Sequence, residues 1–116
     1  MFVGRASHFI LPLIAGGLGL AATVWGATPT ALHAVKVVTI NQFRYDPPEV
    51  TVRQGDVVEW KNLDIVPHTA TSVDGKSFDS GSIATGGSWR FTTVRKGTYE
   101  YLCTFHPNMK ATLVVK

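Results

Sequence analysis

The stretch Cys103-Thr104-Phe105-His106-Pro107-Asn108-Met109 holds the only cysteine of the chain, with a histidine three residues later and a methionine three residues after that. A thiolate, an imidazole and a thioether are soft or borderline metal ligands. Two histidines and one cysteine in a trigonal set, with a weak axial methionine, are typical of a blue-copper electron-transfer centre. Cys103, His106 and Met109 therefore predict most of a copper site, and His68 is the strongest candidate for the missing histidine.

The spacing of these residues indicates a tight loop. Residues at positions i, i+3 and i+6 alternate between the two faces of a strand, and Pro107 has no backbone N–H with which to continue regular strand pairing. We predict that Cys103 ends a strand, that the following loop wraps His106 and Met109 around one ion, and that His68 arrives from another strand. Each residue alone also has a plain structural interpretation, such as a buried cysteine or a core methionine.

The ligand types favour copper over zinc. Zinc sites favour four firm nitrogen, sulfur or oxygen donors in a closed tetrahedron, and a thioether is a poor ligand for them. One type 1 copper that cycles between Cu(I) and Cu(II) fits the set better. Catalysis would require an open coordination position and a substrate pocket, so the ligand set predicts electron transfer and no enzymatic activity.

Residues 1–34 form a segment distinct from the rest of the chain. Arg5 precedes an uncharged stretch over residues 9–27, and small residues follow through Ala34. This pattern is typical of a secretory signal peptide. An uncleaved membrane anchor is the alternative, because the stretch approaches the roughly 20 residues that a spanning helix needs. Both interpretations place residues 35–116 in the periplasm or in another exported location.

The predicted segment removes two histidines from consideration, because His8 and His33 both lie within it. The remaining 82 residues (116 − 34) suffice for one domain with a marginal hydrophobic core, which a bound metal would stabilise. A lone cysteine in an exported chain cannot form an internal disulfide, so Cys103 is a free thiol, half of an intermolecular bridge or a metal ligand. Without Arg5, the domain has ten basic and eight acidic residues scattered along its sequence, which argues against a nucleic-acid partner.

From residue 35 onward, short β-branched or aromatic runs alternate with Gly, Pro, Asn and Asp, and we predict an all-β domain of around seven strands in a sandwich or barrel. The segment 72–87 is expected to be a long connection, with or without a short strand, and with Phe78 and Ile83 as its main apolar anchors. The expected strands cover residues 35–40, 49–53, 56–61, 88–93, 99–103 and 110–116.

Two motifs resemble the cupredoxins, and among them the short-loop proteins of the amicyanin and plastocyanin type. They read Pro48-x-Val50-x-Val52-x-x-Gly55-Asp56-x-Val58-x-Trp60-x-Asn62 followed by Pro67-His68, and Gly97-x-Tyr99-x-Tyr101-x-Cys103-Thr104-x-His106-Pro107-x-Met109-x-Ala111. The resemblance covers most of the domain. It implies a Greek-key β-sandwich with copper near one end, and electron transfer between exported redox proteins.

The resemblance also implies roles for residues around the ligands. Asn62 is expected to tie the His68 loop to Thr104. Pro107 cannot donate a hydrogen bond to the cysteine sulfur, which is expected to lower the reduction potential. The loop histidine, His106, is expected to serve as the electron port.

An apolar patch of Phe105, Pro107 and Pro67 around His106 would suit transient redox partners of the dehydrogenase or cytochrome class. Phe105 and Asn108 depart from the residues usual at these loop positions in amicyanin, so the partner stays open. We expect a monomer, with no lasting membrane partner unless the N-terminal segment is retained.

Two further functional classes compete with electron transfer. An exported copper carrier would bind the metal and pass it on, although such proteins tend to have Met or His in excess, and here Met1 and Met109 are the only methionines. An oxidase or nitrite reductase module needs additional histidines for a second copper, whereas residues 35–116 contain only His68 and His106.

Overall fold

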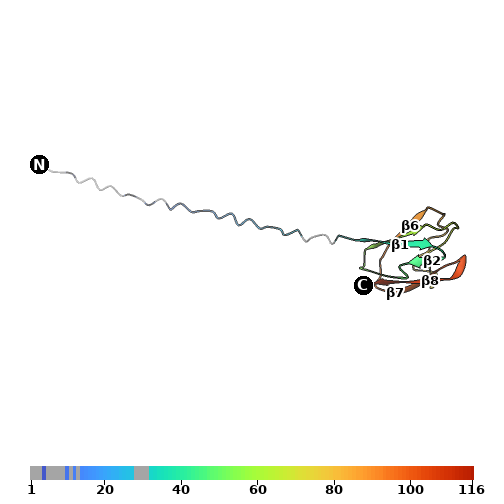
Figure 1. Ribbon diagram of the computed structural model, residues 1–116. Coiled ribbons are helices and arrows are strands. Elements are labelled where there is room, and N and C mark those ends of the chain that lie inside the picture. The colour runs from blue at the N-terminus through green and yellow to red at the C-terminus, as the bar shows by residue number, and fades with distance from the viewer. Residues whose placement is uncertain (1–3, 5–9, 11, 13, 28–31) are drawn as a thin grey trace.

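The computed structural model describes residues 4, 10, 12, 14–27 and 32–116 (Figure 1). Arg5, His8 and residues 28–31 of the predicted signal segment lie outside the described residues. Within the described part of the chain, no helix is both long enough and apolar enough to span a bilayer.

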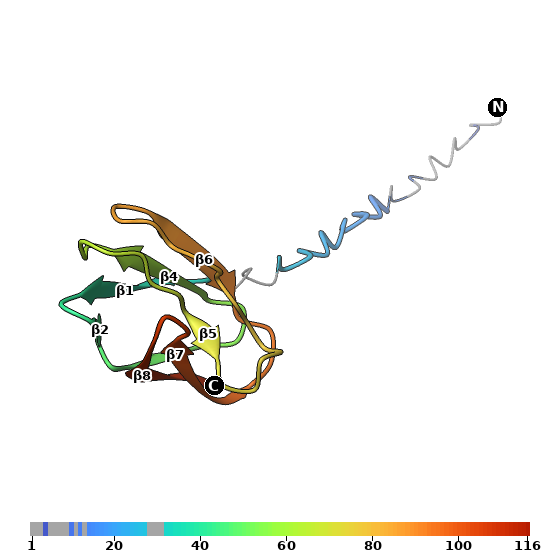
Figure 2. The ribbon, with the colours of Figure 1, turned by 90° about the vertical axis from the view of Figure 1, so that its right-hand side faces the viewer.

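Among the described residues, eight strands form two four-stranded sheets that pack as a sandwich (Figure 2), which confirms the predicted all-β fold. One sheet has the order β2-β1-β4-β6 and the other β3-β8-β7-β5. The pairs β1–β4 and β3–β8 are parallel, and the remaining neighbours are antiparallel. The strands are β1 Val35–Asn41, β2 Arg44–Asp46, β3 Glu49–Val52, β4 Val57–Asn62, β5 Thr71–Ser72, β6 Ser88–Thr92, β7 Gly97–Cys103 and β8 His106–Val115.

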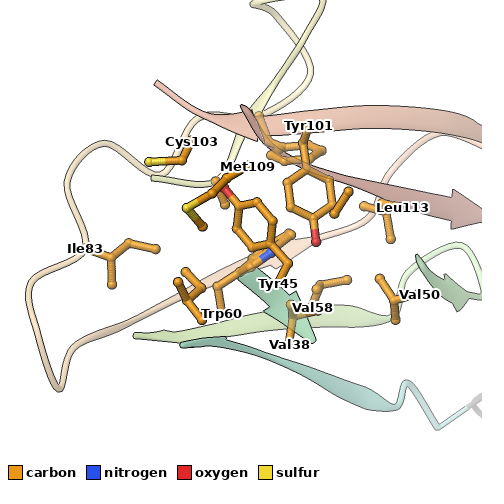
Figure 3. Close-up of a cluster of buried hydrophobic side chains, with 14 of the residues drawn as sticks. Val38, Tyr45, Val50, Val58, Trp60, Ile83, Tyr101, Cys103, Met109 and Leu113 are labelled. Carbon is orange, nitrogen blue, oxygen red and sulfur yellow. The ribbon is translucent and has the colours of Figure 1, made fainter. Parts of the chain in front are cut away.

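The core lies between the sheets because apolar side chains recur at every second position of the longer strands. Val58 and Trp60 on β4 face Tyr101 on β7 and Leu113 on β8, and all four are fully buried (Figure 3). The Trp60 and Tyr101 rings meet edge to face, with centroids 5.5 Å apart. This alternation is the reason why the strand positions were predictable.

Two short strands were not predicted from the sequence. β2 has three residues and precedes Pro47, and β5 has two, so neither is long enough to show an alternating pattern. The expected connection 72–87 contains the second residue of β5 at its start and no other strand residue, and Phe78 and Ile83 are buried within it. An isolated bridge pairs Ile83 with His68.

The last strand begins earlier than predicted, at His106 and not at Lys110. Leu102 pairs with Lys110, but the next residue, Cys103, pairs with His106, so residues 107–109 bulge out of the ladder. The absence of an N–H at Pro107 suits this unpaired position. Residues 104–105 and 107–109 are therefore unpaired in this ladder, as the predicted loop between Cys103 and Met109 requires.

The carboxylate of Asp56 fastens the chain where it enters the fold. It accepts hydrogen bonds from the N–H of Arg53 at 2.8 Å and from the N–H of Ala34 at 2.9 Å. The carbonyl of Ala34 in turn accepts a bond from the N–H of Val57 at 2.9 Å. These backbone donors, that of Arg53 first, hold the pKa of the Asp56 carboxyl below its ordinary value.

Replacing Asp56 with Asn should flatten the acid dependence of stability. The pKa of Asp56 is lower in the folded than in the unfolded state. The ionised carboxylate therefore contributes to the free energy of unfolding above the unfolded-state pKa, and this contribution is lost as the pH falls through the folded-state pKa. The wild-type free energy of unfolding should therefore fall between about pH 5 and pH 2, and more steeply than that of Asp56→Asn. Denaturant unfolding at several pH values measures both slopes. Glu100→Gln, which removes an exposed carboxylate, is the matched control; equal slopes in all three proteins would refute the assignment.

Candidate metal centre

Three predicted ligands converge at one end of the sandwich. Cys103 ends β7 and is fully buried, His68 is fully buried on the bridge to Ile83, and His106 begins β8 and is half-buried. The Sγ of Cys103 lies 3.6 Å from Nδ1 of His68 and 3.7 Å from Nδ1 of His106. One donor atom from each of the three residues lies within 4.8 Å of the others.

The spacing of the three donors fits a small metal ion. The Cys103 sulfur lies 3.6 and 3.7 Å from the two imidazole nitrogens, and all three donors lie within 4.8 Å of one another, close enough to share one ion with bonds of about 2.0–2.3 Å. A buried thiol among imidazoles also matches the preference of copper for soft and borderline ligands.

Met109, the fourth predicted ligand, lies in the bulge that follows His106. It is 5% exposed and belongs to the same buried cluster as Cys103. Figure 3 shows the two sulfur-bearing side chains at the same end of that cluster. A thioether in this position suits the weak axial role.

The ring of His68 is oriented by a carboxylate that the sequence prediction did not include. Its Nε2 lies 2.8 Å from Oδ2 of Asp64, which is 5% exposed. A proton on Nε2 that is donated to Asp64 leaves the lone pair on Nδ1, the nitrogen that faces Cys103. In the sequence, only the four-residue spacing of Asp64 and His68 hints at this contact. That spacing does not predict a contact unless the conformation of the turn between the two residues is known.

Comparison with known proteins decides the family. The model of the cupredoxin-like domain family matches residues 17–115. The chain is 34% identical over 112 residues to amicyanin of Paracoccus denitrificans, with 87% of this chain and 83% of that protein covered. This chain is a cupredoxin.

Further relatives support this assignment. The chain is 31% identical over 120 residues to plastocyanin of Synechococcus sp., which covers 90% of this chain and 85% of that protein. An oxidised amicyanin variant superposes with a TM-score of 0.66 at 30% identity, covering 70% of this chain and 81% of that one. A purple cupredoxin from Nitrosopumilus maritimus gives 0.65 at 26% identity, covering 70% and 99%.

The donor set and the relatives together define the cofactor and the class of activity. The cupredoxin carries one type 1 copper, which supplies one-electron chemistry when bound. It is an electron carrier and not an enzyme.

Thr69, the residue after His68, joins the two ligand loops of this cupredoxin. Its N–H donates to the Sγ of Cys103 at 3.3 Å, and its hydroxyl accepts a bond from the N–H of Thr104 at 2.9 Å. Its carbonyl accepts a 2.5 Å bond from the phenol of Tyr45. One residue thus contacts the sulfur ligand, the loop after it and the opposite sheet.

The predicted tie from Asn62 to Thr104 was wrong, because Thr69 makes that connection. The side-chain amide of Asn62 instead donates to the carbonyls of Val66 and Ile83, both at 2.9 Å, and its oxygen accepts from the N–H of Asp64 at 2.9 Å. Asn62 still braces the loop that carries His68. Its amide nitrogen has two N–H donors, and both are used by these two carbonyls.

Phe43 covers both histidines and was not singled out from the sequence. Its ring meets that of His68 edge to face at 5.4 Å and that of His106 at 4.9 Å. Gln42 and Phe43 have φ angles of 50° and 58°, a conformation that is rare for residues other than Gly. The N–H of Phe43 donates to Oδ2 of Asp64 at 3.0 Å. Asp64 therefore holds this strained turn and His68 with the same oxygen, and these bonds, that from Phe43 first, hold the pKa of Asp64 below its ordinary value.

Exposed apolar side chains occur on the segments that carry the ligands. Phe105 is 53% exposed, and Pro67 and Pro107 are also exposed, in line with the patch expected around His106. Three further apolar residues, on the turn after β1 and the loop after β4, are also exposed. They are Phe43, Leu63 and Ile65.

Asp64→Asn should weaken copper binding about 10- to 100-fold, because it removes the carboxylate that orients His68. The neutral amide oxygen of Asn accepts the bonds from His68 and Phe43 more weakly than the charged carboxylate oxygen does. Competition with a chelator of known affinity measures this change. Glu100→Gln removes an equal charge from an exposed position on β7 and should leave copper affinity unchanged. Equal copper affinities for Asp64→Asn and the wild type would contradict the role of Asp64.

Proposed function

We propose that this cupredoxin is an exported protein that shuttles single electrons between redox partners, with His68, Cys103, His106 and Met109 as the copper ligands. The observation that carries the proposal is the placement of the Cys103 sulfur 3.6 and 3.7 Å from two imidazole nitrogens in a buried pocket of the fold. A thiolate and two imidazoles in a trigonal set serve both oxidation states of copper.

The surroundings of the ligands support rapid electron exchange. Asp64 fixes the ring of His68, the Thr69 N–H fixes the Cys103 sulfur, and Phe43 packs against His106. Ligands held in this way by the protein move little when the charge of the metal changes. A copper carrier, in contrast, has to release its metal, which a buried cysteine between two braced loops disfavours.

His106 is the proposed electron port. It is the one half-buried residue among the four proposed ligands, and exposed Phe105, Pro67 and Pro107 accompany it. A small apolar patch supports brief, low-area encounters with a redox protein, and we propose a dehydrogenase or a cytochrome as the class of partner. The protein would act as a monomer in these encounters.

We propose that residues 1–34 contain the export signal, that cleavage falls before Ala34, and that residues 35–116 form the copper domain. Cleavage directly after Ala34 would remove the backbone groups that bond to Asp56 and Val57. These two hydrogen bonds favour a mature chain that retains Ala34. N-terminal sequencing of the exported protein tests this: a first residue at or before Ala34 is expected, and Val35 as the first residue would contradict it.

The copper-loaded protein should show an intense visible band near about 600 nm, because charge transfer from a thiolate dominates the spectrum of a His₂Cys copper site. Cys103→Ala should lose the band completely, and reversible voltammetry of the wild-type protein should show a one-electron couple. A colourless wild-type protein that still binds copper would refute electron transfer and favour the copper carrier.

Pro107→Ala should raise the reduction potential by roughly 40 mV. The variant gains a backbone N–H in the loop after Cys103. If that N–H donates to the sulfur, a hydrogen bond worth about 1 kcal/mol in favour of the reduced site corresponds to that shift for one electron. Among the described residues, the backbone donor to this sulfur is Thr69. Voltammetry of both proteins provides the measurement, and an unchanged potential would count against this role of Pro107.

A further inference from the structure

Five basic residues that are far apart in the sequence gather at one end of the sandwich, which we call the basic end. Lys36, Arg53 and Lys116 line one cleft together with Ala34 and Asp56. Arg95 and Lys96 join this end through the turn before β7, because Gln54 bonds to the carbonyls of both Val94 and Lys116. All five basic side chains are exposed. They are Lys36, Arg53, Arg95, Lys96 and Lys116.

The positive charge of the basic end has little compensation from the acid that lies there. Asp56 is 5% exposed, and its two oxygens already accept bonds from the backbone N–H groups of Arg53 and Ala34. The residues that line the cleft include three basic side chains and one acid, Asp56. The sequence-based expectation of evenly scattered charge therefore does not hold for the folded surface.

The basic end is opposite to the metal centre because the long strands run from one to the other. β4 begins at Val57, next to Asp56, and ends at Asn62 beside the His68 loop, a span of about 17 Å. β7 begins after Lys96 and ends at Cys103. Figure 1 shows the C-terminus and the start of β1 at one end of the domain and the loop before β8 at the other.

The N-terminal chain joins the fold at the basic end. Ala34, bonded to Asp56, directly precedes β1, and the apolar stretch over residues 9–27 lies only a few residues earlier in the sequence. A membrane-directed segment and a cluster of basic side chains therefore meet at the same point of the domain. A cluster of Lys and Arg side chains is attracted to anionic lipid surfaces, and the five basic side chains stay on the domain when the apolar segment is cleaved.

We propose that the basic end binds the surface of an anionic phospholipid bilayer, with the metal centre directed away from the membrane. This goes beyond the proposed function, since electron transfer requires no membrane. The basic end binds lipid whether or not the N-terminal segment is retained, because all five basic residues lie outside that segment. In this orientation His106 and the apolar residues around it stay open to a redox partner while the protein is held at the bilayer.

The test compares vesicles of phosphatidylglycerol and phosphatidylcholine with vesicles of phosphatidylcholine alone, using protein isolated from the exported fraction and cosedimentation as the readout. The anionic vesicles should bind the wild type more strongly, and salt at about 0.5 M should remove the preference. The double variant Arg95→Gln/Lys96→Gln should bind anionic vesicles roughly 30-fold more weakly, because each basic side chain beside such a surface contributes roughly fivefold.

The matched control is Arg44→Gln/Lys61→Gln, which removes the same two charges from exposed positions near the opposite end. This variant should bind nearly as well as the wild type. Equal losses in the two double variants would show that net charge alone attracts the protein to lipid, and no preference of the wild type for anionic vesicles would show that there is no lipid site; either result overturns the proposal. A retained apolar segment contributes equally to every variant, so it does not affect the comparison.

Orientation has a separate readout. Reduction of the copper by a small soluble reductant should proceed at the same rate, within about twofold, in free and vesicle-bound protein, because the bilayer lies at the opposite end. A tenfold slower reduction on vesicles would overturn the proposed orientation. Cosedimentation does not depend on the colour of the protein, so a failure of the electron-transfer proposal stays distinguishable from a failure of lipid binding.

Discussion

The metal centre depends on the pairing of Cys103 with His106 across a three-residue bulge. Leu102 pairs with Lys110, so without the bulge Cys103 would face Met109, and His106 would lie outside the ladder. The bulge instead brings an imidazole nitrogen to 3.7 Å from the sulfur. Proline supports this arrangement, because at position 107 there is no N–H that could restore regular pairing. A single irregularity in one strand pair thus sets the distance between two of the proposed ligands.

The other half of the site depends on Asp64, which holds two elements with one carboxylate. The ring of His68 and the N–H of Phe43 both bond to its Oδ2, and Phe43 in turn packs against both histidines. Positive φ angles at Gln42 and Phe43 cost conformational energy, and the bond from Asp64 offsets part of that cost. The turn after β1 therefore contributes to the metal centre, because it places the Phe43 ring against both histidines.

The four proposed ligands, the two-sheet architecture and most of the core were predictable because each has a signal within a few residues. Alternating apolar residues indicate strands, and Cys103, His106 and Met109 stand within seven positions. Asp64, Phe43 and Thr69 were missed as supporting residues because their roles depend on contacts between distant segments. Thr69 illustrates the difference: its neighbour His68 was easily assigned, but its bond to Thr104 spans 35 residues and depends on the packing of β7 against the loop after β4. β2 and β5 are too short to show a periodic pattern.

The same limit applies to charge. Lysines and arginines at positions 36, 53, 95, 96 and 116 look dispersed in the sequence. In the fold, the start of β1, the residue after β3, the turn before β7 and the residue after β8 lie at one end. Every long strand that ends near the metal centre has its other end in this basic surface, because a sandwich of this size has only two ends. The separation of a charged end from an apolar end follows from strand length and direction. It allows one small domain to present two unlike surfaces, with the metal ligands at only one of them.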